Sequence, residues 1–166
     1  MRVRELMTTD LITLNENDSL NLAQAEMSLA RIRHLPVIRK GRLVGLVTHR
    51  DILRAMCSIF SDLDAMEQTE VLRNIQVKEI MATGVMTIGP EADAAEAGRR
   101  LLAGKFGCLP VVVELDRLVG IITEADFVAL AVEHLAAESR TGAGRPKDEA
   151  VADAEVVGDD DEDDDR

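Results

Sequence analysis

The chain has 166 residues, and 46% of them are apolar, which is enough to build a core for one domain or for two small ones. It carries a net charge of −12 and three Phe residues, with no Trp or Tyr, so it is a poor partner for nucleic acid and for an anionic membrane surface. No apolar run approaches about eighteen residues and no signal pattern opens the chain, so we expect a soluble, cytoplasmic protein.

Most of the chain is an internal repeat. Three pairs of segments match: VRELM (3–7) with VKEIM (77–81), LPV (35–37) with LPV (109–111), and LVGLVTHRD (43–51) with LVGIITEAD (118–126). The offset is 74 residues for the first two pairs and 75 for the third. One inserted residue, where RKGR faces VELDR, explains the change and predicts a surface turn at that place.

Each copy begins with the same predicted elements. A short amphipathic turn ends at Met7 or Met81, and an extended piece follows, LITL in the first copy and VMTI in the second. Apolar side chains at helical spacing then predict helices over 20–32 and 94–103, and Gly104 is a plausible stop for the second helix.

Each copy ends with two strands and a helix. LPV opens a pair of strands joined by a tight polar turn, and the last helix begins at Thr48 or Thr123. Because the strands are largely apolar on both faces, we expect helices to cover the sheet. Two β-α-β-β-α units packed about a pseudo-twofold axis would form one α/β module.

The segment between the copies, residues 58–76, is predicted to be a helical connector. It lacks Gly and Pro and carries apolar residues at intervals along its length. Packing against the module and contact with a second copy of the chain both explain this pattern.

The C-terminal segment, residues 138–166, is predicted to be a disordered acidic tail. It holds twelve acidic and four basic residues, a net charge of −8, and it includes the run DDDEDDD. Like charges repel along such a run, and few apolar side chains are available to bury. A solubilising role and a protein-binding role are both open.

The motif Thr-x-x-Asp occurs twice, as THRD (48–51) and TEAD (123–126). Each copy follows an apolar strand, so the pair can cap a helix, with the threonine at the N-cap and the acid in the first turn. The same residues suit a nucleotide, because a helix N-terminus binds phosphate and a nearby carboxylate accepts hydrogen bonds from ribose hydroxyls.

The registered repeat of V-[RK]-E-[LI]-M, LPV and G-apolar-apolar-T-x-x-D resembles a pair of cystathionine-β-synthase-type (CBS) domains, together a Bateman module. The resemblance covers roughly residues 1–135. It implies four parts: a first CBS motif (1–57), the connector (58–76), a second CBS motif (77–137) and the tail (138–166).

The resemblance also implies a ligand site between the two motifs. Modules of this family often bind AMP, ADP, ATP or S-adenosylmethionine there, with the motif Asp on the ribose and the Thr on ribose or phosphate. Carried onto this chain, the two sites are Thr48 with Asp51 and Thr123 with Asp126. Two pairs of residues are candidates for contact with the base: Ile12 with Thr13, and Met86 with Thr87.

Charge separates the two sites. Arg50 lies inside the first motif, where the second has an alanine, and Glu124 lies inside the second, where like charge would discourage a further phosphate. The Thr48 site is therefore favoured for phosphate. His34, directly before LPV, either points into the cleft or is a half-buried histidine.

The sequence thus predicts a non-catalytic regulatory module that binds an adenine nucleotide, forms a homodimer and acts on a protein partner in trans. A dimeric scaffold with vestigial clefts and an S-adenosylmethionine sensor are the alternatives. We expect no metal and no enzyme activity, because no His, Cys, Asp and Glu residues have metal spacing and no nucleophile has a recognisable setting. Cys57 and Cys108 are expected to be free thiols.

Overall fold

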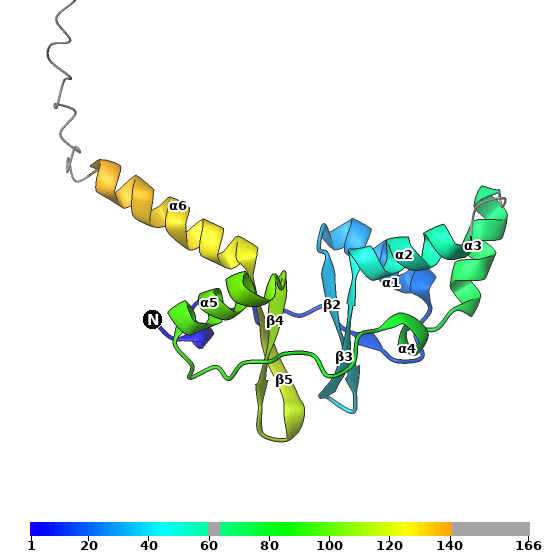
Figure 1. Ribbon diagram of the computed structural model, residues 1–166, viewed down its shortest axis with the longest axis horizontal. Coiled ribbons are helices and arrows are strands. Elements are labelled where there is room, and N and C mark those ends of the chain that lie inside the picture. Colours follow the sequence, from blue (N-terminus) through cyan, green and yellow to red (C-terminus); the bar gives the residue numbers. More distant parts are fainter. Residues whose placement is uncertain (60–63, 141–166) are drawn as a thin grey trace, which may run out of the picture.

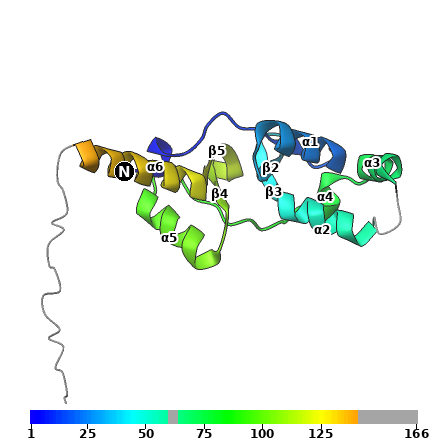
Figure 2. The same cartoon turned by 90° about the horizontal axis from the view of Figure 1, so that it is seen from above.

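Two similar halves lie side by side in the computed structural model, which describes residues 1–59 and 64–140 (Figure 1). Each half is a β-hairpin with helices packed against it, and the view from above separates the two sets of helices (Figure 2). Of the predicted disordered tail, 138–166, residues 138–140 are helical instead, and 141–166 lie outside the described residues, as do the connector positions 60–63.

The elements follow the predicted repeat. The first copy and the connector contain η1 (Val3–Glu5), β1 (Leu14–Asn15), α1 (Leu20–Ala30), β2 (His34–Arg39), β3 (Arg42–Thr48), α2 (His49–Ile59) and α3 (Ala65–Asn74). The second copy contains α4 (Val77–Ile80), α5 (Ala94–Gly104), β4 (Cys108–Val113), η2 (Glu114–Asp116), β5 (Arg117–Thr123) and α6 (Glu124–Arg140). The α/β fold class is therefore confirmed.

The strands form one sheet in the order β1-β2-β3-β5-β4. β1 is parallel to β2, and the other neighbours are antiparallel. The two hairpins meet through one paired position, Arg42 opposite Arg117. The halves therefore share little backbone pairing and are joined mainly by side chains and by crossing segments.

The inserted residue lies in a hairpin turn. In the first hairpin Lys40 and Gly41 both have positive φ, 52° and 77°, which suits a tight two-residue turn. The second hairpin accommodates its extra residue in η2, where Leu115 and Asp116 have φ of 60° and 58°. The insertion leaves the paired strands on both sides intact.

The opening segment of each copy packs on the other half. The Thr8 amide donates to the Ile121 carbonyl at 2.9 Å, and the Ile121 amide donates back to the Thr8 carbonyl at 3.0 Å. Ala82 and Leu46 exchange the equivalent pair of bonds at 2.9 and 3.0 Å. The sequence repeat and the packed half are therefore different units, and each crossing segment fastens the two halves together.

Two glycines permit this crossing. A Cβ at Gly45 would lie 2.6 Å from the Met81 sulfur and 2.9 Å from the Ala82 carbonyl oxygen. A Cβ at Gly120 would lie 2.5 Å from the Met7 sulfur, in the equivalent place. These glycines are required by close backbone approach, since neither has a positive φ.

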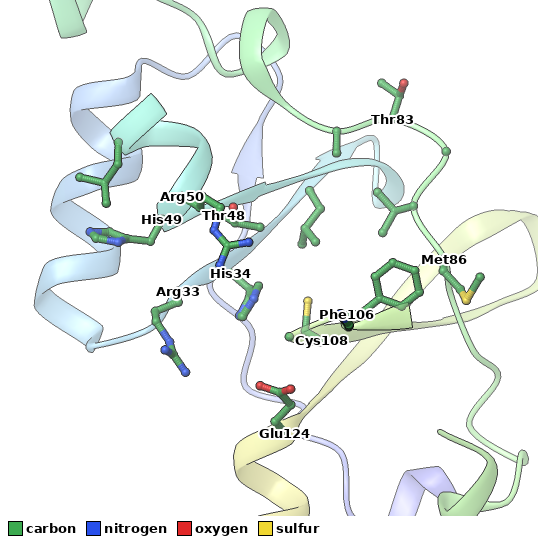
Figure 3. Close-up of a pocket in the computed structure, with 17 residues that line it drawn as sticks. Arg33, His34, Thr48, His49, Arg50, Thr83, Met86, Phe106, Cys108 and Glu124 are labelled. Carbon is green, nitrogen blue, oxygen red and sulfur yellow. The ribbon is translucent and has the colours of Figure 1, made fainter. Parts of the chain in front are cut away.

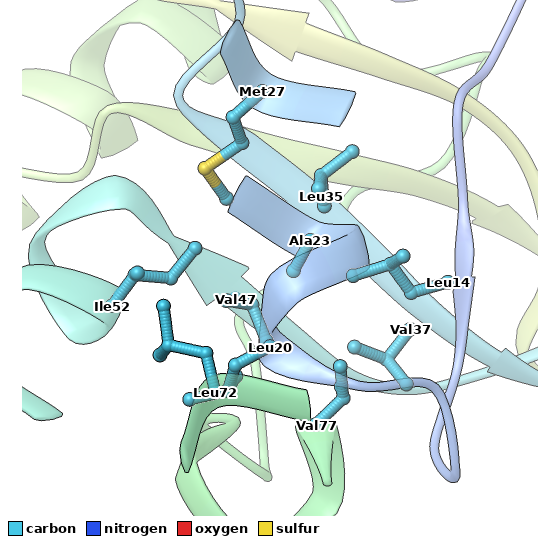
Figure 4. Close-up of a cluster of buried hydrophobic side chains, with 10 residues drawn as sticks. All are labelled: Leu14, Leu20, Ala23, Met27, Leu35, Val37, Val47, Ile52, Leu72 and Val77. Atoms are coloured by element: carbon cyan, nitrogen blue, oxygen red, sulfur yellow. The ribbon is translucent and has the colours of Figure 1, made fainter. Parts of the chain in front are cut away.

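Three clusters of buried side chains form the core, and Figure 4 shows the first. The first half buries ten residues: Leu14, Leu20, Ala23, Met27, Leu35, Val37, Val47, Ile52, Leu72 and Val77. Leu72 belongs to α3, so the connector packs on the module. The second half buries Val3 among its residues. The third cluster lies between the halves and joins Leu46 and Ile121.

Several predicted boundaries are wrong in detail. The extended pieces are mostly irregular: β1 has two residues, and Ile88 forms only a single bridge, to Val111. α1 ends at Ala30 because Arg31 is left-handed, with φ of 55°. α5 ends at Gly104, one residue beyond the predicted 94–103; its left-handed cap is Lys105, and Gly104 leaves space for the Phe106 ring.

Candidate functional site

A cleft of about 780 Å³ opens between the two halves (Figure 3). Its walls come from the end of β3 and the start of α2, from the extended segment 82–86, and from the turn before β4. The segment 82–86 reaches this place because the Ala82–Leu46 hydrogen bonds hold the second copy's opening segment on the first half. The cleft is therefore assembled from both copies of the repeat.

Four of the predicted site residues line this cleft: His34, Thr48, Arg50 and Met86. Six do not line it: Ile12, Thr13, Asp51, Thr87, Thr123 and Asp126. Of the two pairs considered for the base, only Met86–Thr87 contributes a residue, Met86, to the cleft that Thr48 lines. The extended segment that contains Ile12 instead follows Thr8, which is bonded to the second half at Ile121.

Thr48 and Asp51 form a reciprocal pair at the start of α2. The Asp51 carboxylate accepts at one oxygen, Oδ2, from the Thr48 amide at 2.9 Å and from the Thr48 hydroxyl at 2.6 Å. The Asp51 amide donates back to the Thr48 hydroxyl at 3.3 Å. This geometry is that of a capping box, so the capping interpretation of the motif holds in the structure.

Thr123 and Asp126 repeat the arrangement at the start of α6. Asp126 Oδ2 accepts from the Thr123 amide at 2.6 Å and from its hydroxyl at 2.8 Å. The intervening residue Glu124 lines the cleft described above, on its far side from Thr48. Each motif therefore contributes a charged side chain to this cleft, Arg50 from the first and Glu124 from the second.

The cleft is positively charged although the chain is acidic. Arg33, Arg50 and Lys105 line it and are exposed, while Glu124 is the one acidic residue among its described lining. Within residues 1–59 and 64–140, none of the three cations forms an ion pair. Uncompensated cations at the mouth of a cleft favour an anionic ligand.

His34 and Cys108 occupy equivalent positions at the centre of the cleft. The His34 ring lies against Gly107, where a Cβ could not fit. Burial, and then the charge of Arg33, hold the pKa of His34 below its ordinary value of 6.5, while Glu124 and Asp51 oppose the shift. Burial raises the pKa of Cys108 to about 12, so this thiol stays protonated and is no nucleophile at neutral pH.

An apolar wall completes the cleft, and the sequence did not single out its residues. Leu53, Val85 and Phe106 line it, and Phe106 lies beside Met86 (Figure 3). Phe106 keeps 37% of its surface exposed, in a chain with three Phe residues. Because aromatic residues are rare in this chain, the position of Phe106 shortly before LPV was the signal in the sequence that could have marked it as a site residue.

The described residues offer binding groups rather than reactive ones. Within residues 1–59 and 64–140, no three His, Cys, Asp or Glu side chains gather as ligands for a metal ion. No helix in this part of the chain is long and apolar enough to cross a membrane. The cleft combines hydroxyl and guanidinium donors with an apolar wall, which suits a ligand with an anionic end and a flat apolar end.

Comparison with known proteins agrees with this architecture. The family model for the CBS domain matches residues 3–58 and 77–133. A CBS domain-containing protein of Dictyostelium discoideum is 31% identical over 134 residues, which cover 80% of this chain and 92% of that protein. Other curated relatives are longer, and the chain spans between 23% and 45% of their length.

Two solved structures share the fold. The AcuB protein of Vibrio cholerae superposes with a TM-score of 0.72 at 34% identity, covering 84% of this chain and 97% of that one. CBSX2, solved in complex with AMP, superposes with a TM-score of 0.68 at 25% identity, covering 81% and 98%. The repeat, the fold and the family match together show that this chain belongs to the CBS domain family, as a tandem pair of CBS domains.

Proposed function

We propose that this CBS pair is a non-catalytic regulatory module that binds an adenosine phosphate in the cleft beside Thr48. The observation that carries the proposal is the composition of the cleft: a hydroxyl at a helix start, three exposed cations and an apolar wall surround one space of about 780 Å³. The relative CBSX2 was crystallised with AMP, which supports a ligand of this class.

Each part of such a ligand has a matching surface. The base packs against Met86 and Phe106, which supply apolar area. The ribose lies by Thr48, whose amide and hydroxyl Asp51 holds in place from behind the cleft wall. The phosphates meet the Arg50 guanidinium at the start of α2.

The second motif is the weaker site in this proposal. Its Thr123–Asp126 pair has the same hydrogen bonds as the first pair, so it can hold a ribose in the same manner. However, the second motif has Glu124 where the first has His49, and it has Ala125 where the first has Arg50. A nucleoside without phosphate, or S-adenosylmethionine with its cationic sulfur, fits this charge better than a nucleotide does.

Ligand binding would act through the junction of the halves. The two hairpins pair at one position only, so their relative placement depends on the groups between them. A ligand that contacts β3, segment 82–86 and the turn before β4 bridges both halves and stabilises one arrangement. A protein partner in trans, or a second copy of the chain, would bind preferentially to that arrangement.

The exposed helix faces support self-association. Val128, Val132 and Leu135 form a stripe along α6 and are 62%, 59% and 62% exposed. Such an exposed apolar stripe suits a symmetric contact with a second copy, and sedimentation velocity would report the resulting dimer.

A panel of ligands tests the proposal. We expect calorimetric titration of the full chain with AMP, ADP, ATP and S-adenosylmethionine to give saturable heat with at least one nucleotide, and a matching rise in melting temperature. If none of the four gives heat or thermal stabilisation, the clefts are vestigial and the chain is a dimeric scaffold.

A further inference from the structure

The acidic run at the C-terminal end of this chain and the cationic cleft have opposite charge. We propose that residues 159–165, DDDEDDD, dock in the cleft and compete with the phosphates of its ligand. The inference rests on the proposed function, because it names the regulation of the same site. The occupant is a segment of this chain, and its chemistry is that of a short polyanion.

Charge complementarity is the first argument. Three exposed cations and one carboxylate line the cleft, and none of the cations has an ion-pair partner in the part of the chain that the structure describes. The segment 141–166 carries eleven acidic and three basic residues, and seven of the acids are consecutive. A run of carboxylates presents the same anionic oxygens to guanidinium groups as a polyphosphate does.

Reach is the second argument. α6 begins at Glu124, in the wall of the cleft, and ends at Arg140. Its 17 residues place Arg140 about 25 Å from the cleft at 1.5 Å per residue. Eighteen residues, 141–158, then precede the acidic run. At about 3.3 Å per residue they can span about 60 Å, which is more than twice the return distance.

A second cationic hollow lies at the hairpin tips, and it is the less favourable site. Lys40, Arg42 and Arg117 line it together with Glu114. The tips lie at the opposite ends of β3 and β5 from the cleft, and α6 extends away from them (Figure 1). The length of β3, seven residues, adds about 20 Å to the distance that the C-terminal segment must span to reach the hairpin tips. Docking in the cleft therefore closes a shorter loop.

The test compares the full wild-type chain with a full chain in which the run is neutralised: D159N, D160N, D161N, E162Q, D163N, D164N and D165N. Without nucleotide, the two proteins should differ at low salt in the backbone amide resonances of cleft residues such as Arg50, Gly107 and Glu124. The difference should vanish at about 0.5 M salt, where charges are screened.

Binding of ATP gives the second readout. A tethered competitor acts at an effective concentration of about 1 mM, so we expect the neutralised chain to bind ATP about three- to tenfold more tightly at low salt. The gain should disappear at high salt. Equal ATP affinity of the two proteins at low salt would overturn the competition.

Two charge reversals serve as matched controls. Arg50→Glu should abolish the amide differences, because it removes a cation of the cleft, whereas Arg117→Glu should leave them unchanged. Amide differences that gather instead at Lys40 and Arg42 would overturn docking in the cleft. If neither protein binds nucleotide, the proposed function fails, and the amide comparison still decides where the acidic run lies.

Discussion

Gly45 shows how a single hydrogen atom in place of a side chain shapes this module. Gly45 and Gly120 occupy matching positions in the two copies of the repeat. The sequence alone does not explain why both copies need a glycine there. The structure supplies the reason: another segment crosses the strand at contact distance. That crossing depends on tertiary packing, which spacing along the chain does not encode.

We predict that Gly45→Ala lowers the free energy of unfolding by about 1–3 kcal/mol, because the added methyl overlaps the Ala82 carbonyl and the Met81 sulfur. Urea denaturation measures the change. Gly89→Ala is the matched control, since nothing lies within 4 Å of its Cβ position, and it should change stability by less than about 0.5 kcal/mol. Equal effects of the two substitutions would contradict the close approach.

Asp51 has two roles in this account, and substitution separates them. Asp51→Ala should cost about 1 kcal/mol of stability through the lost cap, and it should also weaken ATP binding at the proposed site. Asp93→Ala removes the cap of α5, where Asp93 accepts from the Ala95 amide at 2.7 Å. It should cost similar stability and leave ATP affinity unchanged. Thermal melts and calorimetry on both variants check this; unchanged ATP affinity in Asp51→Ala would leave Asp51 as a cap alone.

His34 gives the molecule a pH dependence. Its pKa is lowered in the folded chain, chiefly by burial, so the unfolded chain binds the proton more readily. Stability is therefore fully present above about pH 6.5 and falls as the pH drops below that value. Melting temperatures between about pH 7 and 5 should fall less steeply for His34→Gln than for the wild type. His134→Gln, on the exposed face of α6, should keep the wild-type slope; equal slopes for all three proteins would contradict this account.

At the scale of elements, the hairpins and long helices were predictable because each has a strong local signal. LPV and the apolar run around each glycine mark paired strands, and helical spacing marks α1 and α5. The extended pieces after Met7 and Met81 were not predicted well. Their apolar residues suit a strand, but whether they pair depends on the strands that tertiary packing places beside them. Lys105, rather than Gly104, is the left-handed cap, since the Phe106 ring needs the space beside Gly104.

The crossing of the opening segments leads to a reciprocal prediction. Val3 is fully buried in the core of the second half, and Val77 in that of the first. Truncation of either to Ala should cost about 1–3 kcal/mol. Hydrogen exchange should quicken at the Ile121 amide in Val3→Ala and at the Leu46 amide in Val77→Ala, because these amides bond to the crossing segments. The exchange pattern contradicts the crossing if Val3→Ala quickens exchange at Leu46 alone.

For the whole molecule, the repeat predicted two halves and a site between them, but not how the cleft is assembled. Thr48 and Met86 come from different copies and line the same cleft because the second copy's opening segment crosses onto the first half. Lys105 and Phe106 enter the same space from the turn before β4. No linear pattern joins these four residues, so the sequence could name His34 and Arg50 as candidates without placing them on one surface.

The central claim is that an adenosine phosphate binds in this cleft, and titration of ATP into two arginine variants tests it most directly. Arg50 lines the cleft, and Arg117 lines the hollow at the hairpin tips. Loss of a charge-assisted hydrogen bond costs about 1.5–3 kcal/mol, so Arg50→Ala should weaken ATP binding about tenfold or more, while Arg117→Ala should bind as the wild type does. ATP affinity that is unchanged in Arg50→Ala, or reduced equally in both variants, would contradict the account.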